Sequence, residues 1–179
     1  MPLVKAGQIV DDRFVRVADG AAIPEGVPAL LPAARWLDDA DQLSRRQAPT
    51  GLIWPNNRPV AELAPHLQYL ALVALVFPSF KDGRAFSQAR LLRERYGFAG
   101  ELRATGQVLR DQFLFMLRAG FDALETSKAI DAAAFADAAR RYSVFYQPTG
   151  DGRTTALRAR LARAIPATRE LELVSHAST

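Results

Sequence analysis

The sequence contains no cysteine and only two histidines, His66 and His176. The absence of cysteine excludes disulfides, thiolate nucleophiles, iron–sulfur ligation by thiolates and cysteine-based zinc sites. His66 falls in a predicted helix and His176 lies near the end of the sequence, so one chain cannot build a histidine-rich metal site. We therefore predict neither a metal site nor a thiol-based redox centre.

Long apolar runs and a concentrated charge of one sign are also missing. The longest strongly apolar stretch, Tyr69–Phe77, is too short to span a bilayer, and the first residues lack the charged and apolar regions of a signal peptide. Lysine and arginine number 23 against 19 acidic residues, and the arginines are spread over most segments. We therefore expect a cytoplasmic protein that binds neither membranes nor nucleic acid.

Sequence fingerprints of bound cofactors are absent as well. No GxGxxG motif follows a predicted strand, and no GxxxxGK[ST] motif occurs. A Ser-His-Asp triad would have to recruit His66 from a distant part of the chain. We predict no cofactor, and the residues alone name no reaction.

Short apolar runs alternate with helical periodicity between residues 51 and 147. The run Leu72–Phe77 is continuously apolar, which is typical of a strand covered on both faces in a parallel sheet. The alternation predicts an α/β fold of right-handed βαβ units with a mainly parallel sheet, either open or closed into a partial, TIM-like barrel. The expected strands are 29–31, 51–54, 72–77, 101–105, 123–126 and 144–146, and the expected helices are 33–46, 60–70, 85–96, 111–119 and 130–142.

The two ends of the chain are predicted to differ from this core. Residues 8–10 and 13–17 are β-type runs separated by an aspartate pair, which predicts a small N-terminal β-hairpin over residues 8–17. Residues 148–179 are basic and form either an amphipathic helix or a tail. The single α/β domain is thus expected to span residues 1–147.

Polar residues follow the predicted strands, where parallel α/β folds and barrels place their ligands. Lys81 and Arg84 lie beside a glycine at a helix start, which suits an anion because free backbone N–H groups and the helix dipole favour negative charge. Arg103 is expected to converge on the same place. The candidate anion-binding residues are Lys81, Asp82, Gly83, Arg84, Ser87, Arg103, Thr105 and Gly106, with Asp111, Gln112 and Glu125 as supporting residues and Asn56, Asn57 and Arg58 as further loop candidates.

A structural interpretation of the same residues stands beside this one. Asp82 would cap a helix, while Arg84 and Arg103 would form ion pairs with Asp111 or Glu125. A general acid/base pair of Asp111 and Glu125 is a third interpretation, although the sequence fixes neither their separation nor their pKa values.

The predicted helix 111–119 is apolar on nearly every side. Such a helix is either deeply buried or part of an oligomer contact. A homodimer formed through this helix is therefore one expectation.

The segments FPSFKDGRAFSQARLLRERYGFAGELRATGQVLRDQ and RAGFDALE resemble a family of small bacterial proteins of unknown function that are labelled as oxidoreductases of sulfite reduction. The resemblance covers residues 54–147, and KDGRAFSQARLLR and GELRATGQVLRDQ are its specific part. In that family the genes lie close to those for sulfite reductase and for adenylylsulfate or phosphoadenylylsulfate reductase. The positions that match the family pattern are Asp82, Gly83, Arg84, Ser87, Arg90, Gly100, Glu101, Arg103, Gly106, Asp111, Gln112, Arg118, Gly120, Phe121 and Asp122.

The resemblance implies a role in assimilatory sulfate reduction and leaves two hypotheses. In the first, the protein is a non-catalytic accessory protein that docks on sulfite reductase or its electron donor, since no redox-cofactor motif occurs and the oxidoreductase label comes from the family alone. In the second, it is an enzyme or binder of a small oxyanion (sulfite, sulfate or a phosphate ester) held by Arg84 and Arg103.

Overall fold

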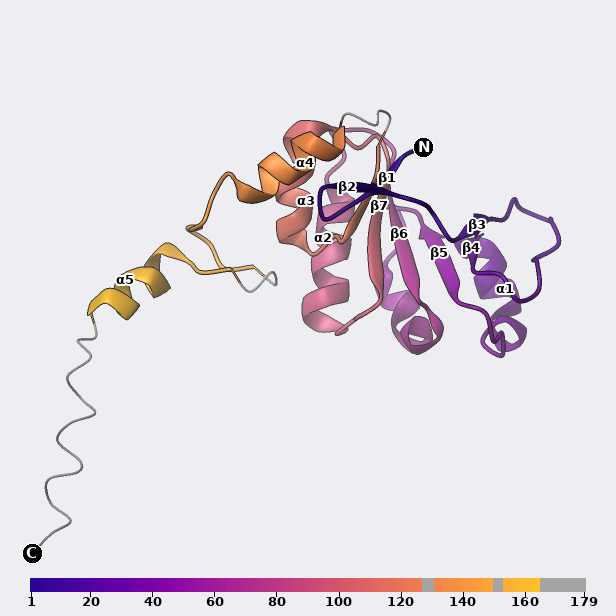
Figure 1. The fold of residues 1–179 in the computed structure, drawn as a ribbon. Coiled ribbons are helices and arrows are strands. Elements are labelled where there is room, and N and C mark those ends of the chain that lie inside the picture. Colours follow the sequence, from indigo (N-terminus) through magenta and orange to yellow (C-terminus); the bar gives the residue numbers. More distant parts are fainter. Residues whose placement is uncertain (127–130, 150–152, 165–179) are drawn as a thin grey trace, which may run out of the picture.

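A single eight-stranded sheet forms the centre of the computed structural model, which describes residues 1–126, 131–149 and 153–164 (Figure 1). The strands are β1 (Leu3–Lys5), β2 (Gln8–Val10), β3 (Val15–Arg16), β4 (Ala29–Pro32), β5 (Thr50–Trp54), β6 (Leu72–Phe77), β7 (Glu101–Gly106) and β8 (Ala123–Glu125). The helices are α1 (Ala33–Leu43), the 3₁₀ helix η1 (Val60–Tyr69), α2 (Arg84–Arg90) with its π-helical continuation η2 (Leu91–Arg95), the 3₁₀ turn η3 (Arg110–Gln112), α3 (Phe113–Ala119), α4 (Asp131–Arg140) and α5 (Ala156–Ala164). None of these helices is long and apolar enough to cross a membrane.

The strand order is β2-β1-β8-β7-β6-β5-β4-β3, and the six strands from β3 to β8 are parallel. Neighbours in this part of the sheet are also neighbours in the sequence, as in a β/α barrel, whereas a doubly wound sheet reverses its order at a switch point. The predicted α/β class is confirmed, and the sheet is a curled half-barrel.

An ion pair across the sheet shows how strongly it curls. Arg16 on β3 donates to both carboxylate oxygens of Glu125 on β8 at 2.9 Å. Five strand intervals separate β3 from β8, which in a flat sheet amounts to about 24 Å, far beyond the reach of two side chains. The strands therefore bend until the first and the last parallel strand face each other across a concave surface.

Helices α1, η1, α2 and α3 cover the convex face of the sheet (Figure 1). Val73, Leu75 and Phe77 of β6 point to this face and belong to one core with residues of α1, η1, α2 and α3. Leu72 and Ala74 point to the concave face, where they join Leu30 and Phe14 in a second, smaller apolar cluster. Phe14 comes from the crossing segment (residues 11–14), which connects β2 at one edge of the sheet to β3 at the other (Figure 1).

Local sequence explains the form of η1 and the ends of η2 and α3. Pro65 cannot donate a backbone hydrogen bond, and it lies inside η1, which is a 3₁₀ helix. Gly97 and Gly120 adopt positive φ angles of 63° and 101° after η2 and α3, as helix-ending glycines do. The predicted helices and the five strands from residue 29 to residue 126 are present with small shifts at their ends.

The predicted hairpin over residues 8–17 is wrong in its second strand. The N-terminal hairpin pairs β1 with β2 around Ala6 and Gly7, both with positive φ. Residues 15–16 instead pair in parallel with β4 at the far edge of the sheet. The aspartate pair does not turn the chain back, and the side chain of Asp12 binds Arg103 on the concave face.

The predicted strand 144–146 is also wrong. Phe145 forms only an isolated parallel bridge with Thr155, outside the sheet. Its apolar side chain is buried against Arg118 and Arg153 instead of a neighbouring strand. Ile130, the GDG segment 150–152 and residues 165–179, with His176, lie outside the described residues.

Candidate functional site

The Lys81–Arg84 loop follows β6 at the carboxyl edge of the sheet, as predicted. Asp82 accepts hydrogen bonds from Nε and Nη2 of Arg84 at 3.0 and 2.6 Å and from the Arg84 backbone N–H at 3.3 Å. The Arg84 guanidinium, with help from the Asn56 amide, holds the pKa of Asp82 well below its usual range. The Lys81 ammonium lies 5.7 Å from the centre of the Phe80 ring. Asp82 therefore stays ionised and partly neutralises the basic loop.

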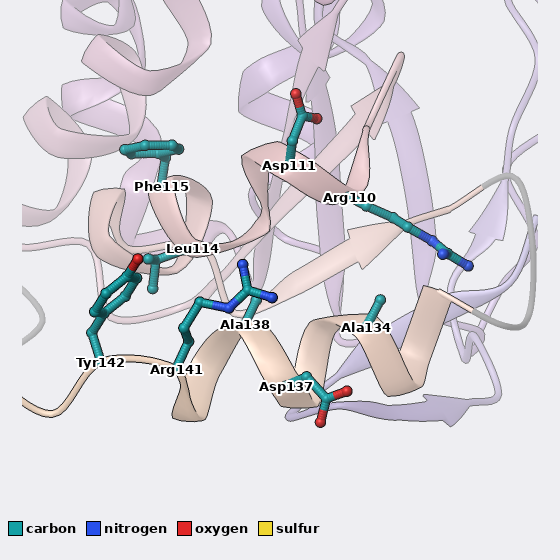
Figure 2. A pocket seen from close by; sticks show the side chains of 9 residues that line it. All are labelled: Arg110, Asp111, Leu114, Phe115, Ala134, Asp137, Ala138, Arg141 and Tyr142. Carbon is teal, nitrogen blue, oxygen red and sulfur yellow. The ribbon is translucent and has the colours of Figure 1, made fainter.

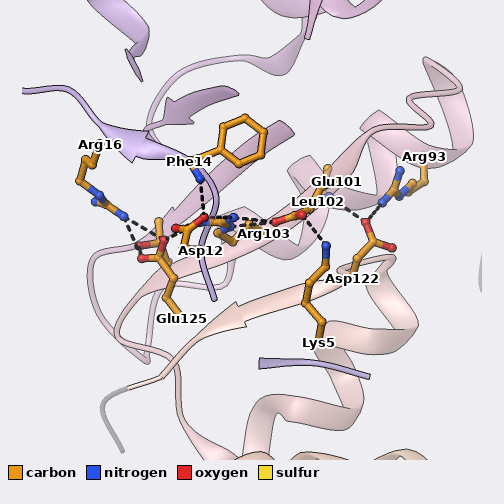
Figure 3. Close-up of polar contacts among 11 residues, drawn as sticks. Lys5, Asp12, Phe14, Arg16, Arg93, Glu101, Leu102, Arg103, Asp122 and Glu125 are labelled. Carbon is orange, nitrogen blue, oxygen red and sulfur yellow. Dashed lines mark hydrogen bonds and ion pairs between the residues drawn. The ribbon is translucent and has the colours of Figure 1, made fainter. Parts of the chain in front are cut away.

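Arg103 lies on the concave face and not at the carboxyl edge of the sheet, where it was expected to meet a ligand. Its side chain is 1% exposed. Its guanidinium binds Asp12 through both terminal nitrogens at 2.6 and 3.0 Å, Glu101 at 2.9 Å and Glu125 at 3.3 Å (Figure 3). Almost all its N–H donors are thus used within the chain.

Two further cations complete this cluster, which we call the concave-face cluster (Lys5, Asp12, Arg16, Glu101, Arg103, Thr105 and Glu125). Lys5 binds Glu101 at 2.6 Å, Arg16 binds Glu125, and the Thr105 hydroxyl donates to Glu125. Three cations balance three carboxylates, so the cluster carries no net charge. Such a neutral, hydrogen-bonded set in a low-dielectric region stabilises one arrangement of the chain and offers little to an anion.

The ionisation of the cluster follows from these contacts. Burial would raise the pKa of Asp12, but hydrogen bonds from Arg103 and from the Phe14 backbone N–H outweigh it and hold that pKa below its usual range. Burial would lower the pKa of Arg103, and its bonds to Asp12 and Glu101 reverse that effect. Both groups are charged at neutral pH.

The pKa of Asp12 predicts acid sensitivity. Because the folded-state pKa lies below the unfolded value of about 3.9, the stabilisation is complete above that value and is lost as the pH falls below about 4. Asp12→Asn should cost about 1–2 kcal/mol at pH 7 and make stability fall less steeply between pH 5 and pH 3. Urea unfolding across this range tests it, with the exposed neighbour Asp11→Asn as the control. Parallel pH profiles of wild type and Asp12→Asn would contradict this origin of the sensitivity.

The structure does not bring the two predicted basic loops together. Arg84 is exposed at the start of α2, whereas Arg103 is buried on the concave face, and the contacts of the described residues give them no common partner. Thr105 belongs to the concave-face cluster. Gly106 ends β7 with a φ of 94°, and an added Cβ would collide with the Phe77 carbonyl oxygen, so its role is close packing of two strand ends. The structural interpretation of Arg103 and Glu125 as an ion pair is thus the observed one.

Asp111 and Gln112 lie together at η3, apart from Glu125. The Gln112 amide donates to the Phe80 carbonyl, which ties η3 to the loop after β6. Asp111 lines two hollows on either side of Phe115, of about 460 and 540 Å³. Since Glu125 is enclosed by Arg16, Arg103 and Thr105, the described contacts do not pair it with Asp111 as an acid and a base.

The first of these hollows opens between α3 and α4 (Figure 2). Phe115 and Tyr142 present their rings at one end of it, and Arg110 and Arg141 extend beside it. Phe115 is 64% exposed and Tyr142 is exposed. The second hollow lies on the other side of Phe115, toward Arg90 and Arg118. Phe115 is therefore an exposed aromatic ridge between two depressions with arginines around them.

Sequence reasoning missed the contributions of Asp12, Phe14 and Arg16 to the concave face. Only the alternation of Glu101, Arg103 and Thr105, with apolar residues between them, signalled a polar surface on one side of β7. Helical spacing also places Arg93 on the solvent side, but it donates to the carbonyls of Gly100 and Gly120 and pairs with Asp122. Arg93 therefore joins η2 to the residue before β7 and to the end of α3.

Within the described residues, no group of three or more histidine, aspartate and glutamate side chains could hold a metal ion. The fold and the polar clusters together define an α/β half-barrel whose buried charges are paired internally.

The family model for a bacterial protein of unknown function (DUF934) matches residues 51–157, and the chain belongs to this family. The match contains the parallel strands β5 to β8 with η1, α2, α3 and α4. No curated protein matches the chain.

Proposed function

We propose that this protein is an accessory protein of assimilatory sulfate or sulfite reduction that docks on sulfite reductase or its electron donor. The family to which the chain belongs has no known function, so the proposed pathway is supported by the resemblance that the KDGRAFSQARLLR and GELRATGQVLRDQ blocks carry. The observation that carries the docking role is the exposed position of Phe115 between two hollows.

One side of α3 is available to a partner, while the other holds the fold. Phe113, Met116 and Ala119 are buried and join the main core. Phe115 points outward, and Leu109 just before η3 is also exposed. Contiguous exposed apolar patches on soluble proteins mark interaction sites. We call the surface formed by Leu109, Arg110, Asp111, Leu114, Phe115, Arg118 and Tyr142 the α3 surface.

The composition of the α3 surface indicates the chemistry of its partner. Aromatic residues and arginine are enriched at the centres of protein interfaces, and they carry most of the binding energy. Four arginines (Arg90, Arg110, Arg118 and Arg141) border the two hollows, against the carboxylates of Asp111 and Asp137. The matching partner surface is acidic, with an apolar depression that receives Phe115.

The basic C-terminal residues are part of the same proposal. Leu157 and Leu161 of α5 are exposed among arginines, and Arg118 on the α3 surface donates to the Gln147 carbonyl. We take residues 1–147 as the domain and residues 148–179 as an attached basic segment that adds to docking.

Replacing Phe115 by alanine should weaken the complex with sulfite reductase at least tenfold, because a central aromatic anchor is worth about 2 kcal/mol or more. Tagged protein is used to capture sulfite reductase from sulfate-starved bacterial cells, and the affinity is then measured with the purified partners by interferometry. Tyr69→Ala is the matched control, since Tyr69 is a 47% exposed aromatic residue at the end of η1, before β6, and so at the amino edge of the sheet.

Three outcomes would count against the docking role. They are failure to recover sulfite reductase or its electron donor with wild type, equal capture by Phe115→Ala, and equal loss with Tyr69→Ala. A homodimer of the free protein that Phe115→Ala dissociates, measured by light scattering, would assign the α3 surface to self-association instead.

Oxyanion binding is the second candidate function, and one observation favours it. Arg58, Arg84 and Ser87 line a common hollow after β5 and at the start of α2. Arg103 already binds three carboxylates. The proposed oxyanion site therefore contains Arg84 and its neighbours in this hollow but not Arg103.

A further inference from the structure

A hollow of about 400 Å³ lies on the convex side, where the loop after β5 meets α2 and η2. Its size is within the range of small-molecule sites. Pro59, Leu91 and Tyr96 supply apolar surface, and the guanidinium-bearing residues Arg58, Arg84 and Arg95 line it as well. The α3 surface does not include any of these residues, so the hollow is a separate feature of the molecule.

The two walls of this hollow are held in a fixed relation by buried hydrogen bonds. The Gln88 side chain of α2 is almost completely buried, and its amide donates to the carbonyls of Pro55 and Arg58 at 3.1 and 2.8 Å. The Trp54 indole N–H donates to the same Arg58 carbonyl at 3.1 Å. The loop cannot move away from α2 without breaking these bonds, so a ligand would meet a preformed site.

The charge of the hollow is positive. No carboxylate is among its lining residues. Arg58 and Arg84 pair with Glu62 and Asp82 outside the hollow, through exposed contacts that contribute little free energy. Within the described residues Arg95 lies over the Tyr96 ring at 5.8 Å and pairs with no carboxylate. These arginines can therefore turn to an anion at small cost.

Resting on the oxyanion-binding candidate above, we propose that this hollow binds a small organic anion and not an inorganic one. Its phosphate, sulfate or carboxylate group is held by Arg84 and Arg95, and its apolar body packs on Pro59, Leu91 and Tyr96. Planar guanidinium groups bind such oxyanions through paired hydrogen bonds, and the Ser87 hydroxyl, one turn along α2 from Arg84, adds a donor.

Asp82 sets the affinity of this site as an internal competitor. Its carboxylate forms an ion pair with Arg84, in which Oδ2 of Asp82 lies 2.6 Å from Nη2 of Arg84. An asparagine side chain at this position would retain an oxygen to accept the Arg84 backbone N–H but would lose the charge. Asp82→Asn should therefore release Arg84 and tighten anion binding severalfold, an effect that a purely structural pair would not show.

Calorimetric titration with three probes tests the ligand class. Phenyl phosphate combines a dianion with an apolar ring, inorganic phosphate supplies only the anion, and phenol supplies only the ring. We expect phenyl phosphate to bind wild type at least tenfold more tightly than either of the other two probes.

Variants then locate the site. Arg84→Ala and Arg95→Ala should each weaken phenyl phosphate binding at least tenfold, since each removes a charge-assisted contact. Arg90→Ala is the matched control, because Arg90 is on the same helix, is 53% exposed against 58% for Arg84, and also pairs with a carboxylate. Its affinity should stay within twofold of wild type, with circular dichroism and thermal melting confirming that every variant is folded.

The proposal is overturned by any of four results: no heat with phenyl phosphate, equal affinity for inorganic phosphate, an Arg90→Ala effect as large as that of Arg84→Ala, or weaker binding by Asp82→Asn. The docking role proposed above does not enter this experiment, so either proposal can fail alone. Phe115→Ala should bind phenyl phosphate as wild type does.

Discussion

Replacing Arg103 by alanine is expected to lower the free energy of unfolding by about 3–5 kcal/mol, the cost of removing one partner from a buried ion cluster. Arg103 is 1% exposed and joins Asp12, Glu101 and Glu125 on the concave face. Without it, three carboxylates remain close together with only Lys5 and Arg16 to balance them. The crossing segment also loses its main attachment to β7.

Urea unfolding at pH 7 measures this loss, with Arg90→Ala as the control for an exposed, paired arginine, which should cost less than about 1 kcal/mol. Arg103→Lys separates charge from geometry. Lysine keeps the charge but cannot bind Asp12 through two nitrogens at once, so it should recover only part of the stability. A stability of Arg103→Ala within about 1 kcal/mol of wild type would show that the buried cluster is not needed for folding.

Phe14→Ala should cost about 3–4 kcal/mol, because Phe14 fills the concave face against Leu30, Leu72 and Ala74. Phe14 is 5% exposed although it comes from a connection between two edge strands. Its ring also lies 5.9 Å from the Arg103 guanidinium. Removing the ring therefore opens a cavity and uncovers the ion cluster.

A double-mutant cycle tests whether the crossing segment acts as one unit. Phe14 and the Asp12–Arg103 pair both attach the crossing segment to the sheet. If they act together, the double variant Phe14→Ala/Arg103→Ala should lose clearly less stability than the sum of the two single losses. Phe14→Leu keeps most of the apolar volume and should cost about 1 kcal/mol. Strict additivity would mean that the two contacts act independently.

Much of the fold could be predicted from sequence, because it depends on local periodicity. Leu72–Phe77 is apolar without interruption, and the structure shows a strand with buried residues on both faces. The limits of η1 and α3 are local in the same sense, because Pro59 directly precedes η1 and Gly120 directly follows α3. The sequence does not distinguish an open sheet from a partial barrel, because the contact that reveals the curl, the Arg16–Glu125 pair, joins residues far apart in the sequence.

The candidate site could be predicted only in part. The rule that ligands gather at the carboxyl ends of parallel strands selected Arg84 and Ser87, which do line a hollow together with Arg58. The same rule grouped Arg103 with them, although Arg103 pairs in register with Ala74, well before the end of β6. The position of a residue along its strand decides whether its side chain reaches the carboxyl edge of the sheet. The register between neighbouring strands is a tertiary property, which a single sequence does not show.

The contacts that close the concave face also set the order in which the chain can fold. Arg16 and Glu125 are separated by 109 residues, and Lys5 and Glu101 by 96. During synthesis, β1 can pair at once with β2, but its other neighbour β8 and the Asp12 partner Arg103 leave the ribosome much later. Since contacts between distant residues slow folding, β1, β2 and the crossing segment are expected to join last, onto a sheet that β3 to β8 have already formed.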